Sequence, residues 1–118
     1  MKTLKIVCPL ENEYFTTVRL TTGGICSLAD FDVDSTEDFK VCVTESLLIL
    51  KRSGFLSAEL KFTVGEMLVC EIVGENQSGE TQNGFEDEIS YALLNALLGK
   101  VEFSKDENGR VMAISFGA

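Results

Sequence analysis

The segment from Asp34 to Ser53 limits the possible folds more than any other stretch of this sequence. Its apolar residues recur three or four positions apart, which is the spacing of one face of an α-helix. The stripe consists of Phe39, Val43, Leu47 and Leu50, and the residues expected on the opposite, solvated side are Lys40, Thr44 and Lys51. Asp34 or Ser35 can cap the start of the helix, and Gly54 is suited to end it. A helix with one apolar face needs a second layer to cover that face.

The rest of the sequence predicts that second layer. Alternating apolar residues and turn signals predict strands at Leu4–Cys8, Ser57–Val64, Met67–Val73, Val101–Ser104 and Val111–Phe116. Helical spacing predicts two further helices, at Glu13–Leu28 and Glu86–Leu98, and the polar segment Glu75–Gly84 is expected to be a loop. We therefore expect one α+β domain over residues 1–118, a two-layer sandwich in which three helices cover one face of a mixed, mostly antiparallel sheet. Gly23 and Gly24 indicate close packing, a turn or a hinge in the first helix.

The composition excludes several classes of function. A net charge of −9 disfavours binding to nucleic acid or to an anionic membrane, because both require a basic surface. No apolar run approaches the roughly 20 residues that span a bilayer. The first ten residues lack the features of a signal peptide, so we expect a cytoplasmic protein. The chain has no histidine, which excludes a Ser-His or Cys-His nucleophile. The cysteines form no CxxC pair and are expected to be buried, reduced thiols: Cys8, Cys26, Cys42 and Cys70.

Three stretches, read together with the order of the predicted elements, are similar to a known family. They are the pair Arg19-Leu20, the step Thr44-Glu45 and the C-terminal run SYALLNALLGKVEFSKDENGRVMAISF. In this register, over nearly the whole chain, the sequence resembles the GHKL (histidine-kinase-like) ATPase superfamily, specifically the bacterial anti-sigma factor serine kinases. The resemblance implies a dimeric kinase that binds ATP and magnesium. It also implies a sigma factor bound on one surface and an anti-sigma-factor antagonist on another.

The position that would bind magnesium departs from the family pattern. In the family, the long helix carries Glu-x-x-x-Asn, in which the glutamate acts as the base and the asparagine coordinates magnesium. Glu45 matches the base, but the asparagine position falls on Ile49, which offers no oxygen ligand. The resemblance therefore marks Glu45 as a catalytic vestige. The alternative is an ordinary helix carboxylate that pairs with a lysine or is solvated.

The two glycine motifs of the family are degraded as well. In the Asp-x-Gly-x-Gly motif, which binds adenine, the aligned residues are Glu75, Gln77 and Gly79. In the Gly-x-Gly motif, which receives the phosphates, the aligned residues are Glu88 and Ser90. A carboxylate at position 88 would repel a polyphosphate. The segment that would form the ATP lid is shortened to little more than Glu75–Gly84.

These departures together predict a scaffold that has lost its chemistry. We expect a non-catalytic regulatory domain, a pseudokinase, that holds no cofactor or metal and binds another protein. By the resemblance, that partner is a sigma factor or an anti-sigma-factor antagonist, and a homodimer is implied. One alternative is a divergent anti-sigma factor serine/threonine kinase that still binds ATP with magnesium. A second alternative is a sensor that binds a small ligand in the vacated site.

The first predicted helix offers a candidate surface for the partner. Relatives use this region for recognition, and the corresponding residues here are Tyr14, Thr17, Arg19 and Thr21. Arg19 is the expected anchor, because a guanidinium binds a carboxylate through two parallel hydrogen bonds and arginine is enriched at binding hot spots. The alternative for Arg19 is an ion pair within the chain, with Glu11 or Glu13.

Overall fold

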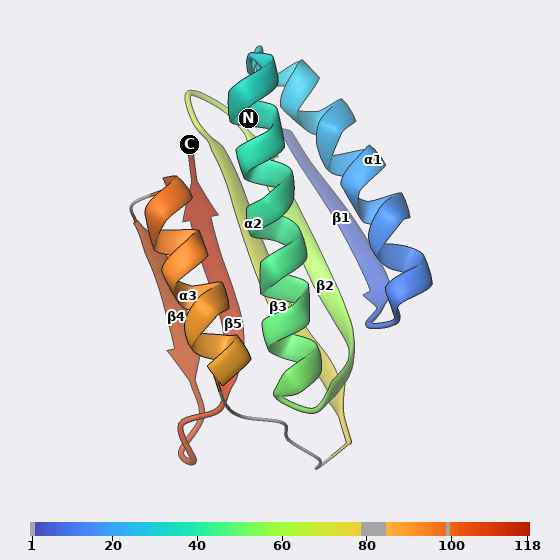
Figure 1. Cartoon of the computed structure of the whole chain (residues 1–118). Helices are drawn as coiled ribbons and strands as arrows, with labels where there is room; N and C mark the ends of the chain where they lie inside the picture. The colour runs from blue at the N-terminus through green and yellow to red at the C-terminus, as the bar shows by residue number, and fades with distance from the viewer. Residues whose placement is uncertain (1, 79–84, 99) are drawn as a thin grey trace.

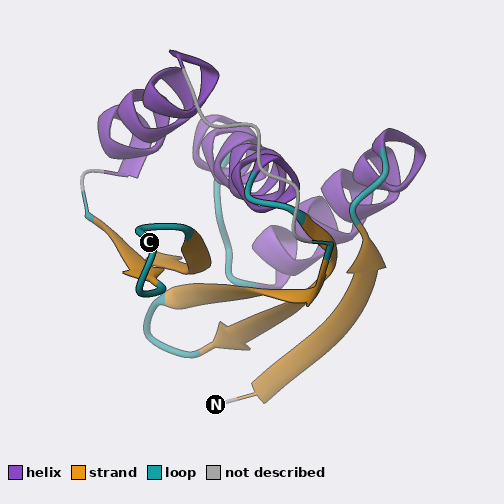
Figure 2. Cartoon of the chain, turned by 90° about the horizontal axis from the view of Figure 1, so that it is seen from below, coloured by secondary structure: helices purple, strands orange, loops and turns teal. Residues whose placement is uncertain are grey.

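Three helices cover one face of a five-stranded sheet in the computed structural model, which describes residues 2–78, 85–98 and 100–118. The elements in chain order are β1 (Lys2–Pro9), α1 (Asn12–Leu28), α2 (Val33–Arg52), β2 (Phe55–Val64), β3 (Leu68–Gln77), α3 (Phe85–Leu98), β4 (Val101–Lys105) and β5 (Val111–Gly117). Figure 1 shows α2 between α1 and α3, and Figure 2 shows all three helices on the same side of the sheet. The predicted two-layer α+β sandwich is confirmed.

The strands follow the order β1-β2-β3-β5-β4, and each neighbouring pair is antiparallel. β2 and β3 form the expected hairpin around Gly65 and Glu66, with Val64 opposite Leu68. α3 follows β3 along the chain, and the β4–β5 hairpin then returns to the sheet so that β5 lies beside β3. The two outer strands are therefore β1 and β4.

The core lies between α2 and the sheet, as the apolar stripe of α2 predicts. All four residues of the stripe are fully buried: Phe39, Val43, Leu47 and Leu50. The ring of Phe39 packs edge-on against Phe31 and against Phe116 of β5, with centroid distances of 5.7 and 5.2 Å. A sheet face needs such a cover because alternate strand residues point into it.

The predicted cap of α2 and the predicted end of β3 are wrong. The cap of α2 is Asp32, whose Oδ1 accepts from the Ser35 N–H at 2.8 Å, and neither Asp34 nor Ser35 has that role. This hydrogen bond lowers the pKa of Asp32. β3 also continues to Gln77, where a loop was expected from Glu75 onward. Pairing with the start of β2 extends it, since Gln77 lies opposite Phe55.

The packing of α1 on α2 explains two further features of the sequence. α1 runs unbroken through Gly23 and Gly24. A Cβ at Gly23 would lie 2.8 Å from Cε of Lys40, so this glycine permits close approach of the two helices. Thr44 is buried against α1, which corrects the expectation that it is solvated.

The four cysteines are free and buried, as expected. Burial raises the pKa of each thiol. Among the described residues, no helix is both long enough and apolar enough to cross a membrane.

Candidate functional site

A cluster of polar side chains joins α2 to α3. Arg52, in the last turn of α2, forms an ion pair through Nε with the Asp87 carboxylate, and its Nη2 donates to Ser90 Oγ at 2.7 Å. Ser90 Oγ donates in turn to Glu45 Oε2 at 2.7 Å. We call Glu45, Arg52, Asp87 and Ser90 the α2–α3 cluster. Each of its residues contacts the next, in the order Glu45, Ser90, Arg52 and Asp87.

Helical spacing brings each half of the α2–α3 cluster to one side of its helix. Glu45 and Arg52 lie seven positions apart on α2, and Asp87 and Ser90 lie three apart on α3. Asp87 is also in the first turn of α3, where the helix dipole favours a carboxylate. Two facing helices thus supply two carboxylates, a guanidinium and a hydroxyl to one contact.

The cluster is largely withdrawn from solvent. Ser90 is 2% exposed and Asp87 is 6% exposed, while Glu45 is half-buried. The adjacent Tyr91 has a raised pKa because it is partly buried and lies near Asp87, although Arg52 acts in the opposite direction. Among the described residues, no buried polar side-chain atom is without a hydrogen-bond partner. A buried polar network that is fully satisfied rigidifies the contact it joins.

The pair Ser90–Glu45 has the polarity of a nucleophile and its base, because the hydroxyl donates to the carboxylate. Two observations oppose that role. Arg52 donates to the same hydroxyl oxygen, and Ser90 is almost fully buried. The described residues therefore leave almost none of Ser90 exposed to a substrate. The arrangement favours a structural link between the helices.

Of the described residues that the resemblance aligns with the family's nucleotide site, only Glu45 and Ser90 come together. Ile49 is 0% exposed and belongs to the core. Glu75 and Gln77 lie in β3, opposite Ser57 and Phe55 of β2. Glu88 is exposed on α3. Gly79 is outside the described residues.

Gln77 has a partner of its own. In the amide orientation that its surroundings require, its side-chain oxygen accepts from Nε and Nη1 of Arg110, which lies just before β5. The residue aligned with an adenine-site glycine thus contributes to a side-chain contact between β3 and the last hairpin.

Sequence reasoning missed Arg52 and Asp87. A signal for Asp87 was present, since Asp87 and Ser90 precede Leu94 by seven and four positions and so share the face of a fully buried leucine. Polar residues on an apolar face indicate a buried partner. No pattern around Arg52 identifies Asp87 as that partner, because the two are 35 residues apart.

The candidate partner-binding residues do not form one surface. Tyr14, Thr17 and Thr21 line a groove of about 140 Å³ between α1 and the outer strand β1. We call this the β1–α1 groove, and its other lining residues are Ile6, Val7, Cys8, Pro9 and Val18. Tyr14 is 42% exposed and Val7 is 64% exposed, so apolar side chains meet solvent beside the groove.

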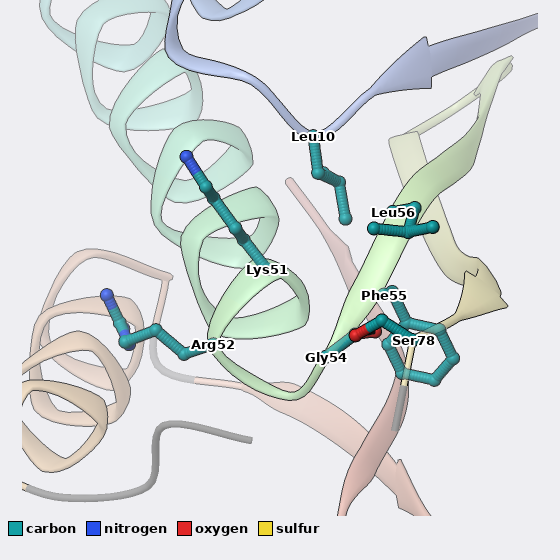
Figure 3. A pocket seen from close by; sticks show the side chains of 7 residues that line it. All are labelled: Leu10, Lys51, Arg52, Gly54, Phe55, Leu56 and Ser78. Atoms are coloured by element: carbon teal, nitrogen blue, oxygen red, sulfur yellow. Dashed lines mark hydrogen bonds between the residues drawn. The ribbon is translucent and has the colours of Figure 1, made fainter. Parts of the chain in front are cut away.

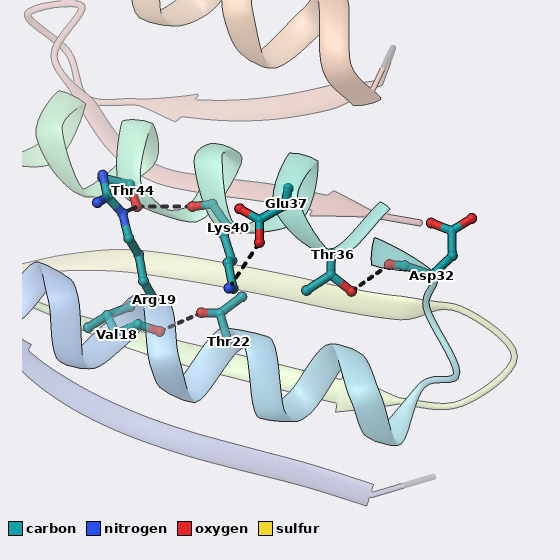
Figure 4. A network of polar contacts seen from close by, with 8 residues as sticks. All are labelled: Val18, Arg19, Thr22, Asp32, Thr36, Glu37, Lys40 and Thr44. Atoms are coloured by element: carbon teal, nitrogen blue, oxygen red, sulfur yellow. Dashed lines mark hydrogen bonds and ion pairs between the residues drawn. The ribbon is translucent and has the colours of Figure 1, made fainter. Parts of the chain in front are cut away.

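Arg19 lies on the other side of α1, toward α2. Its Nε donates to Thr44 Oγ1 at 3.1 Å, and Thr44 donates to the Lys40 carbonyl at 2.9 Å (Figure 4). Among the described residues, neither Glu11 nor Glu13 forms an ion pair with Arg19. The helix therefore separates Arg19 from the other three candidates.

A second cavity, of about 220 Å³, opens where α2 ends and β2 begins (Figure 3). Its lining residues are Leu10, Lys51, Arg52, Gly54, Phe55, Leu56 and Ser78. The cationic groups near it already have partners, because Lys51 Nζ donates to Asn12 at 3.3 Å and Arg52 contacts α3. Ser78 Oγ donates to the Gly54 carbonyl at 2.9 Å. The polar side chains of this cavity thus serve contacts within the fold.

Comparison with known proteins adds no family to this description. No protein-family model matches the chain, and no curated protein sequence matches it.

Proposed function

We propose that this chain is a non-catalytic regulatory domain that binds another protein, on a scaffold that resembles an anti-sigma factor serine kinase. The observation that carries the proposal is the position of Ser90. Its hydroxyl lies between Glu45 and Arg52 and is bonded to both. By the resemblance, a glycine would stand here and its backbone would receive phosphates.

The same contact supports the loss of Glu45 as a base for an external substrate. A general base must be within hydrogen-bond reach of the proton that it removes. The Glu45 carboxylate is already bonded to a hydroxyl of its own chain. Ile49 is buried in the core, and Glu88 adds a negative charge on the side where phosphates would lie. These features support loss of the ATP site.

Protein binding is supported by the surface of α1 and β1. The β1–α1 groove combines exposed apolar side chains with hydroxyl groups, which is the usual mixture in a recognition site. The partner class, a sigma factor or an anti-sigma-factor antagonist, follows from the resemblance alone.

A nucleotide titration separates this proposal from a divergent kinase. Thermal unfolding would be followed with ATP and magnesium together, with ATP alone and with magnesium alone. A ligand at 100 times its dissociation constant stabilises a protein by about 2.7 kcal/mol. We expect no shift beyond that of magnesium alone. A saturable shift that needs both ATP and magnesium would establish the kinase alternative.

Photo-crosslinking in the native host tests the second part of the proposal, that the chain binds another protein. A photoreactive phenylalanine analogue would replace Thr17, in the β1–α1 groove, or Glu102, on the far outer strand β4. We expect a discrete crosslinked protein at position 17 and none at position 102. The proposal fails if both positions capture the same background proteins.

A further inference from the structure

The outer strand β1 presents an open edge. Within the described residues, its eight residues pair only with β2. Figures 1 and 2 show β1 at the border of the sheet, with α1 over its inner face. Half of the backbone N–H and C=O groups of such a strand point away from the sheet and can pair with a further strand.

The edge is basic although the chain is acidic. β1 carries Lys2 and Lys5 and has no acidic residue, whereas the whole chain has a net charge of −9. Lys5 lies directly opposite Lys61 of β2, and like charges in that position destabilise a sheet. Lys2 is six positions from the buried Cys8 and so lies on the sheet face toward the helices, whereas Lys5, three positions from Cys8, lies on the face away from the helices.

The acidic groups near Lys5 on the face away from the helices belong to β2 and β3. Glu71 of β3 is opposite Lys61, and Glu59 of β2 is diagonal to Lys5. Among the described residues, Lys5 makes no ion pair with either of them. A lysine on an edge strand disfavours pairing with a further strand, because its charge loses contact with water, and an acidic strand offsets this cost by supplying an opposite charge.

The β1–α1 groove lies directly beside this edge. Its volume of about 140 Å³ is close to that of cavities that hold a small aromatic molecule. It can therefore take one branched or aromatic side chain from a segment that lies along β1. When a peptide adds a strand to a sheet edge in this way, main-chain hydrogen bonds supply the affinity, and pockets that take every second side chain supply the specificity.

We propose that β1 binds an extended, acidic segment of a partner protein as a sixth strand of the sheet. A carboxylate of that segment lies near Lys5, on the sheet face away from the helices, and one of its apolar side chains, on the opposite face, enters the β1–α1 groove. The inference rests on the proposed protein-binding function, and it adds the chemistry of the partner and its mode of binding.

A second copy of this chain is a poorer occupant. If β1 paired with itself, the seam would contain Lys2 and Lys5 from both copies and no carboxylate from either strand. The like charges of the two strands would repel each other, whereas an acidic strand in place of the second copy would attract the lysines of β1.

The test is a titration followed by amide chemical shifts of the isotopically labelled chain. The probe is a peptide of the same length as β1 that alternates glutamate with valine, and the control peptide alternates lysine with valine. We expect saturable shifts from the glutamate peptide, centred on β1 and the groove residues of α1, and none from the lysine peptide.

Two matched pairs of variants make the test specific. Lys5→Glu should weaken binding about tenfold, because it places like charges in contact, whereas Lys105→Glu on the far edge strand should leave it unchanged. Thr17→Trp fills the groove and should abolish binding, whereas the neighbouring exposed Thr16→Trp should not.

Several results would overturn the inference. These are equal binding of both peptides, shifts centred outside β1 and α1, equal losses in the two lysine variants, or a dimer that Lys5→Glu disrupts. If crosslinking at position 17 captures a partner while the acidic peptide does not bind, the strand-addition inference fails and the protein-binding function stands.

Discussion

The Ser90 hydroxyl donates a hydrogen bond of 2.7 Å to the Glu45 carboxylate and so joins helices whose contacting residues are 45 positions apart in sequence. Arg52 extends the same network to Asp87. The fully buried Leu94 also anchors α3 in the apolar core. The α2–α3 cluster therefore fixes how α3 lies on the central helix, a role that relies on complete pairing of its charges.

Removing both charges of the Arg52–Asp87 ion pair should therefore cost less than the sum of the losses from removing each charge alone. Arg52→Leu leaves the buried Asp87 carboxylate unpaired and should reduce the free energy of unfolding by about 3–5 kcal/mol. The double variant Arg52→Leu/Asp87→Leu should lose clearly less than the sum of the two single variants. Urea unfolding of the four proteins measures this coupling, and strictly additive losses would contradict it.

Glu45→Gln is the control within the same cluster. Its amide oxygen can still accept from Ser90, so the loss in unfolding free energy should stay within about 1 kcal/mol. A loss as large as that of Arg52→Leu would show that the charge of Glu45, and not its hydrogen bond, stabilises the contact.

An asparagine at position 49, the residue that the resemblance would place there, should strongly destabilise the chain. Ile49 is fully buried, so Ile49→Asn both removes apolar volume and buries an amide, at a cost of about 2–5 kcal/mol. Ile49→Val, which removes only one methyl group, should cost about 1 kcal/mol. Urea unfolding measures both. An asparagine variant as stable as the valine variant would mean that the amide reaches solvent or a polar partner.

The helices and hairpins could be predicted because their signals are local. The stripe of α2 and the turn at Gly65 and Glu66 each lie within a few residues of the structure they determine. The error at the end of β3 arises because its pairing depends on residues distant in sequence. β3 continues through the polar residues Glu75 to Gln77 because β2 is there to pair with them.

The candidate site could be predicted only in part. Glu45 and Ser90 were recognisable through a family register, but their contact depends on how α3 is rotated on α2. The partners Arg52 and Asp87 depend on the same rotation, and no periodicity within either helix encodes it. Arg19 was expected beside Tyr14, yet the phase of α1 directs it to Thr44.

The buried thiols predict a loss of stability at high pH. Burial, with smaller effects from Asp38 and Glu45, raises the pKa of Cys42 from 9.0 to about 12. Above pH 9 the unfolded chain therefore loses a proton that the folded chain retains. Stability should be unaffected below that pH and should fall as the pH rises from about 9 toward 12.

Substitution of this cysteine provides the control. Cys42→Ala should lessen the fall in stability between pH 8 and about pH 11, measured by urea unfolding at each pH. Native thiols should also react with a thiol reagent only as fast as the chain unfolds, since all four cysteines are buried. Rapid labelling of Cys42 in the folded protein would contradict both expectations.

Two glycines should respond to alanine in opposite directions. In β3, a Cβ at Gly74 would lie 2.5 Å from Cγ of Phe55, a largely buried ring that closes one end of the core. Overpacking of this kind costs about 1–3 kcal/mol, so Gly74→Ala should lower the unfolding free energy.

In α1, a Cβ at Gly24 meets no described atom within 4 Å. Gly24→Ala should therefore stabilise the chain by up to about 1 kcal/mol, because alanine is the better helix former and restricts the unfolded chain. Thermal and urea unfolding of the two variants would be compared with the parent. If Gly74→Ala were neutral, the Phe55 ring would have to be free to move away from β3. A destabilising Gly24→Ala would mean that the exposed side of α1 makes a contact that is absent from the structure of the single chain.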